Sequence, residues 1–260
     1  MSTNENKDKK AEVTALQAIS AEDRKDWISL AFVQAGICVC VPAFLLGALL
    51  AEAMPIWPAI ISGSLGYLIV VVGMVATGMI GCDLGLASCT CCQAGFGKSG
   101  ARFIVSTIFA VNMIGWFGIQ NGVCGEAFSN AMLAMTGWDI PVVVSNTIWG
   151  IIMLLTAVYG VHALEKLDKI SIPLLMIIMC YGTFLAFKVY GTGNLNDEGT
   201  VQSMSFMSGV ALSFNFTAVG TITGPDYTRF QKSRKDTVKS VFYGVFPMGV
   251  ITCLLYTSDA

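Results

Sequence analysis

Residues 103–134 carry a line of polar side chains that could bind a flat, uncharged ring. Drawn as a helix, the segment places its polar residues within about 120° of arc, namely Asn112, Trp116, Gln120, Glu126 and Asn130. An indole face stacks on a planar ring, and a carboxamide offers a donor and an acceptor together to an amide-like edge. Asn112 or Asn130 taken singly could equally hold two helices together. Trp116 and Gln120 together favour binding.

Two further stretches place similar groups at the same depth. Trp116 lies roughly 20 Å along its helix, near the middle of a bilayer. Gln34 is reached at a similar depth in the first apolar stretch, and Phe214, Asn215 and Phe216 in the sixth. An anionic or cationic substrate requires a fixed counter-charge, and none lies at this level. The set therefore predicts a neutral heterocycle as ligand.

The elements that position these residues are predicted to be membrane helices. The chain is 55% hydrophobic and 12% charged, whereas soluble proteins are about 25% charged, so the excess apolar surface must face lipid. Apolar stretches reach the roughly 20 residues that a bilayer requires. Seven such spans are predicted, at 27–51, 57–80, 103–134, 141–160, 170–190, 201–223 and 238–256. The fold class is therefore an all-α polytopic membrane protein.

The distribution of the 15 Lys and Arg residues predicts the orientation. Basic loops stay in the cytoplasm because they resist translocation. With seven spans, only Lys188 lies on the outer side of the membrane. All the other Lys and Arg residues lie in the tail 1–25 or in the loops on the same side as the tail. We expect a multi-pass protein of the inner (plasma) membrane with its N-terminus in the cytoplasm. Nothing in the charge pattern indicates a nucleic-acid partner.

Spans one and six have compositions typical of broken helices. Gly36 and Pro42 interrupt the first, and the sixth reads SFNFTAVGTITGP, with polar and β-branched residues in place of Leu. Non-helical backbone at membrane depth persists only where protein or a cavity satisfies its polar groups. A Pro kink in an ordinary packed helix is the alternative for either span. Two breaks entering from opposite sides predict a central site.

Three motifs resemble one family. Gly115-Trp116-Phe117-Gly118 in span three, the loop Gly81-x-x-x-Gly85-Leu86, and the run Pro225 to Phe230 occur in the order found in nucleobase-cation symporters of the cytosine/purine permease family. The similarity covers roughly residues 25–256 and corresponds to the N-terminal half. It implies a leucine-transporter-type inverted-repeat fold, here truncated to about seven of twelve transmembrane helices.

The resemblance also implies residue roles. Trp116 corresponds to the stacking tryptophan, Gln120 to the amide one turn later in hydantoin-transporting relatives, and Gln34 to a helix-one amide near the substrate. The aromatic group of helix six would be Phe214 or Phe216, beside Asn215. Leu30 and Val33 would supply backbone carbonyls to a coupling sodium. Cytosine permeases tend to have Gly at the position of Gln120, and hydantoin transporters have Trp on helix six. The resemblance therefore does not decide between cytosine, other nucleobases and hydantoin-like rings as the substrate.

The remaining signals are weaker. Cys82, Cys89, Cys91 and Cys92 have no usual zinc-ligand spacing, so no metal site is predicted. Asp226 and Arg229, three residues apart after span six, are expected to pair at the cytoplasmic mouth. The domain boundaries are a tail at 1–25, a permease domain at 26–256 and four foreign residues at 257–260.

The predicted function is import of a neutral nucleobase such as cytosine by a secondary transporter that needs no cofactor beyond coupling Na+ or H+. Its partners are the nucleobase and the lipid bilayer, with no obligate protein partner. Alternatives are a hydantoin, allantoin, purine or pyrimidine carrier of the same family, an amino-acid carrier of the same fold, and a membrane sensor that does not transport. An enzyme is not predicted, because no catalytic set converges at one depth.

Overall fold

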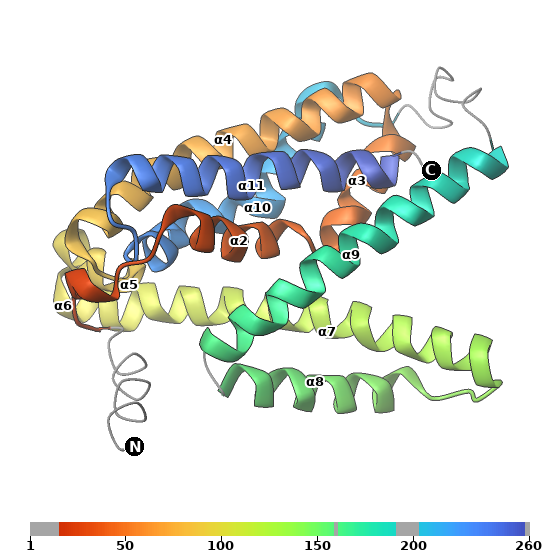
Figure 1. Cartoon of the computed structure of the whole chain (residues 1–260), viewed down its shortest axis with the longest axis horizontal. Coiled ribbons are helices and arrows are strands. Elements are labelled where there is room, and N and C mark those ends of the chain that lie inside the picture. The colour runs from red at the N-terminus through yellow and green to blue at the C-terminus, as the bar shows by residue number, and fades with distance from the viewer. Residues whose placement is uncertain (1–15, 159–160, 191–202, 258–260) are drawn as a thin grey trace. The chain divides into compact units, whose positions relative to one another are not determined.

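The computed structural model describes residues 16–158, 161–190 and 203–257, and the regular elements of these residues are helices (Figure 1). Residues 1–15 of the predicted tail 1–25 and residues 258–260 of the predicted foreign end 257–260 lie outside the described residues. The elements are η2 (Ala21–Asp23), α2 (Trp27–Cys38), α3 (Val41–Ala53), α4 (Ile56–Leu84), α5 (Ser88–Cys91), α6 (Gln93–Gly100), η3 (Ala101–Val105, a π-helix), α7 (Ser106–Thr136), α8 (Val142–Val158), α9 (Val161–Tyr190), α10 (Phe206–Thr228) and α11 (Arg234–Thr257).

Each predicted span coincides with a helix or a helix pair. Within the described residues, Ile56–Leu84, Gln93–Thr136 and Phe206–Thr228 are long and apolar enough to cross a membrane, and the bent pair α2–α3 is a fourth candidate. Val142–Ala157 and Ile170–Leu185 are shorter apolar helices. The apolar helices agree with a multi-pass membrane protein, and the count of seven spans stays a prediction.

The predicted break in the first span is confirmed. Helix α2 ends at Cys38, α3 begins at Val41, and the two are bent by 55°. Cys40 between them is extended, with φ −142° and ψ 153°. Pro42 in the first turn of α3 explains the position of the break, because proline has no N–H to donate to the carbonyl four residues earlier.

The predicted break in the sixth span is wrong. Helix α10 runs without interruption from Phe206 to Thr228 and includes the whole SFNFTAVGT stretch. Helix α10 instead packs along α4 (Figure 1), and its small and polar residues line the crossing. A Cβ built at Gly66 would lie 2.5 Å from the Cβ of Ser213, and one at Gly81 would lie 2.5 Å from the Cα of Pro225. Small residues let the two backbones approach closely, as membrane helix packing favours.

Two hydroxyl groups hydrogen bond across the same crossing. Thr77 Oγ1 donates to the carbonyl of Thr221 at 2.6 Å, and Thr228 Oγ1 donates to the carbonyl of Gly78 at 2.7 Å. Thr228 is fully buried. The polar composition of span six therefore serves a tight helix pair and not an unwound segment.

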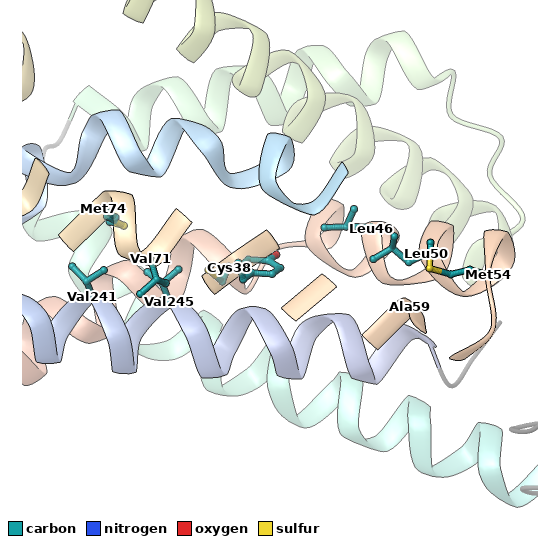
Figure 2. Close-up of a cluster of buried hydrophobic side chains, with 10 residues drawn as sticks. Cys38, Leu46, Leu50, Met54, Ala59, Val71, Met74, Val241 and Val245 are labelled. Carbon is teal, nitrogen blue, oxygen red and sulfur yellow. The ribbon is translucent and has the colours of Figure 1, made fainter. Parts of the chain in front are cut away.

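The chain divides into two compact units. Unit 1 comprises residues 1–95 and 168–260, and unit 2 comprises residues 96–167. The core of unit 1 is a cluster of buried side chains from α2, α3, α4 and α11 (Figure 2), which we call the core cluster: Cys38, Leu46, Leu50, Met54, Ala59, Tyr67, Val71, Met74, Val241 and Val245. A second cluster joins Phe44 of α3 to Ile172 of α9.

Unit 2 contains the hairpin of α7 and α8. The amide of Asn146 on α8 occupies the space beside Gly125, where a Cβ would collide with it, and the side chains of Phe128 and Trp149 meet edge to face at 5.5 Å. Ser129 Oγ donates to the carbonyl of Ile140 in the connection. Gly125 is thus used for helix packing, while a Cβ built at Gly115, Gly118 or Gly122 would meet no neighbour within 4 Å from other elements of the described residues.

Candidate functional site

Gln34 is a fully buried polar side chain next to the break in the first span. It lies in the last two turns of α2 with 0% of its surface exposed, and neither its amide oxygen nor its amide nitrogen has a hydrogen-bonding partner in the described part of the chain. Leaving a buried polar group unsatisfied costs roughly 1–3 kcal/mol. A ligand that supplied a donor and an acceptor would recover that free energy, so this carboxamide is a candidate binding group.

Leu30 and Val33, the predicted cation ligands, lie earlier in the same helix. Leu30 is buried and Val33 half-buried. Both lie within α2, earlier in the chain than Ala35, whose carbonyl accepts the last backbone hydrogen bond of the helix from Val39 N at 3.0 Å. A carbonyl within a helix keeps a second lone pair after its helical bond is made, so either oxygen has capacity for an ion. Their role as ligands stays a prediction.

Phe214, Asn215 and Phe216 are consecutive residues of one continuous helix and therefore point in different directions, about 100° apart. Phe216 is half-buried and packs against the core cluster. Phe214 is half-buried, and Asn215 is exposed. Because Phe216 already contributes to the core of unit 1, Phe214 is the better candidate for the aromatic group of helix six.

Trp116 and Gln120 both lie on α7 in unit 2 and are half-buried. Asn112, one turn before Trp116, is also half-buried, and its amide oxygen has no hydrogen-bonding partner among the described residues. Glu126 and Asn130, at the other end of the predicted stripe, are exposed. The partly covered portion of the stripe is thus the portion that contains the predicted stacking residue.

A second group of polar side chains, which was not predicted from the sequence, lies in the α7–α8 hairpin of unit 2. Asn121 faces Gly150, with its Nδ2 3.2 Å from where a Cβ of residue 150 would be, and Asn146 faces Gly125. The amide oxygens of both asparagines and the indole nitrogen of Trp149 have no partner in the described residues. Asn121 directly follows Gln120 in the sequence but lies off the Trp116 stripe, which is why the helical periodicity did not select it.

The expected pair of Asp226 and Arg229 is wrong. The Asp226 carboxylate instead accepts a hydrogen bond from the backbone N–H of Ser88 at 3.1 Å, so it connects α5 to the end of α10. Arg229 forms no ion pair within the described ranges, and its guanidinium carbon lies 4.8 Å from the centre of the Phe230 ring. Burial lowers the pKa of Arg229 from its ordinary value, an effect that the nearby Asp226 opposes.

The cysteines of the connection between α4 and α6 are free thiols, including Cys89, Cys91 and Cys92. Burial raises the pKa of Cys91 and of Cys92, and neighbouring cysteines and Asp226 add to the rise. Across the described ranges, no three side chains of His, Cys, Asp or Glu are grouped so that they could hold a metal ion. Because their pKa is raised, the thiols of Cys91 and Cys92 stay largely protonated at neutral pH.

Comparison with known proteins agrees with the arrangement of helices. A family model described as "Permease for cytosine/purines, uracil, thiamine, allantoin" matches residues 19–257. The chain belongs to this permease family. Its matched relatives are permeases and not enzymes.

Curated relatives of the permease chain come from bacteria and plants. It is 27% identical over 216 residues to cytosine permease of Escherichia coli K12, covering 82% of this chain and 49% of the relative. It is 25% identical to the purine-uracil permease NCS1 of Arabidopsis thaliana, covering 85% and 41%, and 23% identical to allantoin permease of Bacillus subtilis, covering 86% and 50%. The chain spans about half the length of these relatives.

Solved structures confirm the predicted fold class, an all-α membrane fold of the leucine-transporter type. Mhp1, a nucleobase-cation-symport-1 family transporter solved in a closed conformation with bromovinylhydantoin bound, matches with a TM-score of 0.83 and 17% identity, over 94% of this chain and 57% of Mhp1. The inward-facing conformation of Mhp1 matches with a TM-score of 0.79 and 18% identity, over 92% and 55%. At this identity the likeness concerns the fold alone.

Proposed function

We propose that this permease imports a neutral nucleobase such as cytosine, driven by a Na+ or H+ gradient, with its N-terminus in the cytoplasm. The observation that carries the proposal is Gln34, whose buried, unpartnered carboxamide lies one turn before the 55° break in the first span. A nucleobase has adjacent donors and acceptors on one edge, which a carboxamide can pair with. Relatives named for cytosine, for purine and uracil, and for allantoin support this substrate class.

We propose that Trp116 and Gln120 bind the substrate, on the basis of their chemistry and of the family resemblance. An indole stacks on any planar ring, so Trp116 supplies affinity with little discrimination. Gln120 and Gln34 supply directional hydrogen bonds, and hence the choice among rings. A site that hydrogen bonds its substrate rejects a ring lacking the matching group strongly, because the buried amide is then left unpaired.

A carrier for allantoin or a hydantoin is the second candidate. It is favoured by the amide at Gln120, which cytosine permeases tend to replace with Gly, and by the match to an allantoin permease. These rings present imide and urea edges that pair with carboxamides as nucleobases do. The two candidates therefore differ in the shape of the ring more than in the pairing groups.

Uptake measurements test the proposal. A permease of full family length that carries this sequence is expressed in cells without their own nucleobase carriers, and uptake of labelled cytosine is measured in competition with uracil, hypoxanthine, allantoin and hydantoin. We expect cytosine uptake that unlabelled cytosine abolishes. Replacing Na+ by choline, or adding a protonophore, identifies the coupling ion. Competition by allantoin alone would favour the second candidate, and labelled substrate that binds without counterflow would indicate a sensor.

A further inference from the structure

Residues 19–26, which include the end of the predicted cytoplasmic tail 1–25, hydrogen bond to helix ends in unit 1, and we call them the N-terminal clasp. The N–H of Ile19 donates to the carbonyl of Gly85 at 2.9 Å, directly after α4. The N–H of Lys25 donates to the carbonyl of Phe230 at 2.7 Å, and Lys25 forms a parallel bridge with Gln231. The clasp therefore contacts both the end of α4 and the connection between α10 and α11.

Arg24 contacts both of these segments with a single nitrogen atom. Its Nη1 donates to the carbonyl of Cys82 at 3.0 Å and to the carbonyl of Gln231 at 2.9 Å. Cys82 lies in the last turn of α4, where carbonyls lack intrahelical partners and carry the negative end of the helix dipole. A guanidinium at this place satisfies an orphan acceptor and is stabilised by the dipole. It also fixes two segments that are 149 residues apart in sequence.

Other charged contacts at this end of unit 1 are exposed. Lys232 Nζ lies 2.6 Å from Asp26 Oδ1, and Arg234 forms a bidentate pair with Asp83, but these side chains are between 39% and 74% exposed. Exposed ion pairs contribute little because water and salt screen them. Arg24 is half-buried, and the groups it touches are covered: Cys82 is 2% exposed and Gln231 is 0% exposed.

We propose that Arg24 is a positioning residue that holds the end of α4 and the α10–α11 connection at a fixed separation, so that these helix ends move as one body during transport. It acts through the carbonyls of Cys82 and Gln231 and not through the substrate. The transport part of this inference rests on the proposed function. The contact itself does not, and it can be measured separately.

The thiol of Cys82 reports on the contact. It is buried beneath the clasp, with its Sγ 3.7 Å from the carbonyl oxygen of Gln231. The full chain is treated in native membranes with membrane-permeant N-ethylmaleimide, and modification of each cysteine is followed by peptide mass spectrometry. In Arg24→Ala we expect Cys82 to be modified at least tenfold faster than in the wild type. Arg24→Lys, which keeps the charge and one donor group, should give an intermediate rate.

Two controls separate release of the clasp from general loss of structure. Lys235→Ala removes one positive charge from the first turn of α11, and the side chain of Lys235 is exposed and makes no hydrogen bond or ion pair in the described part of the chain. Its Cys82 rate should equal that of the wild type. Cys38, 1% exposed in the core cluster, should stay protected in every variant. An unchanged Cys82 rate in Arg24→Ala, or a parallel rise at Cys38, would overturn the proposal.

Transport kinetics test the positioning role. In a permease of full family length, Arg24→Ala should lower Vmax severalfold and leave KM for the transported base unchanged, since the substrate groups are not touched. Lys235→Ala should leave both parameters unchanged. A raised KM with normal Vmax would contradict positioning of helix ends. If the wild type carries no nucleobase, the proposed function fails, whereas the Cys82 labelling result still decides whether Arg24 holds the two segments.

Discussion

Gly66 of α4 and Ser213 of α10 lie so close that a Cβ at residue 66 would be 2.5 Å from the Cβ of Ser213 and 2.7 Å from the N of Phe214. Real Cβ atoms do not approach other atoms to this distance, and the nearest atoms include α10 backbone, which cannot rotate away. This crossing explains why the small and polar residues of α10 belong to a continuous helix and do not form a break.

Substituting Gly66→Ala should therefore destabilise the fold. Overpacking of this kind costs about 1–3 kcal/mol, which exceeds the gain of up to about 1 kcal/mol that alanine brings to a helix interior. Thermal unfolding in mild detergent should show a lowered midpoint. Gly182→Ala in α9 is the matched control, because a Cβ built there would meet no neighbour within 4 Å among the described residues, and its midpoint should stay the same or rise. Equal midpoints for both variants would contradict the tight crossing.

Gln34→Met should raise stability while it weakens binding. Methionine has nearly the shape of glutamine and leaves no buried amide unsatisfied, so the free energy of unfolding should increase by about 1–3 kcal/mol. The same change removes the proposed pairing group, so nucleobase binding should weaken at least tenfold. Both effects are measured on one preparation, by thermal unfolding with and without the base. Gln93→Met, at a half-buried position of α6, should change neither; a destabilised Gln34→Met would show that the carboxamide has a structural partner.

Cys91 and Cys92 should react slowly with alkylating reagents at neutral pH. Burial raises the pKa of both thiols, with a further rise from neighbouring cysteines and Asp226, and only the thiolate is nucleophilic. Below the pKa each unit of increase lowers the thiolate fraction tenfold, so the iodoacetamide rate should still be climbing above pH 9, beyond the midpoint of an ordinary cysteine. Mass spectrometry of the modified peptides between pH 7 and 10 measures this. A plateau reached by pH 8 would be inconsistent with the raised pKa.

Features that covalent chemistry determines could be predicted from the sequence, whereas features that depend on a partner distant in the sequence could not. Pro42 lacks an N–H in any context, so the break before it could be predicted from the sequence. The stretch SFNFTAVGT fits either an unwound segment or a close helix crossing, and the glycines of α4 that decide between them lie more than 130 residues away.

Local spacing is also a poor guide to the contacts at the end of α10 and in residues 19–26. Asp226 and Arg229 have the spacing of a helical ion pair, but Asp226 bonds to Ser88, 138 residues earlier. The N-terminal clasp has the polar composition of a tail, and the acceptors of its backbone N–H groups and of Arg24 are backbone carbonyls, which no side-chain pattern encodes. Trp116 and Gln34 were identified from aromatic and amide chemistry placed at one depth, and their roles now depend on measurement.

Cytosine uptake by Trp116→Ala tests the central claim most directly. In a permease of full family length that carries this sequence, the substitution should reduce uptake of labelled cytosine at least a hundredfold, because the stacking face is lost. Trp138→Ala, at a 68% exposed tryptophan beyond the end of α7, should transport normally and be present in the membrane in equal amount. Uptake that survives intact in Trp116→Ala would contradict the account and favour an amino-acid carrier of the same fold.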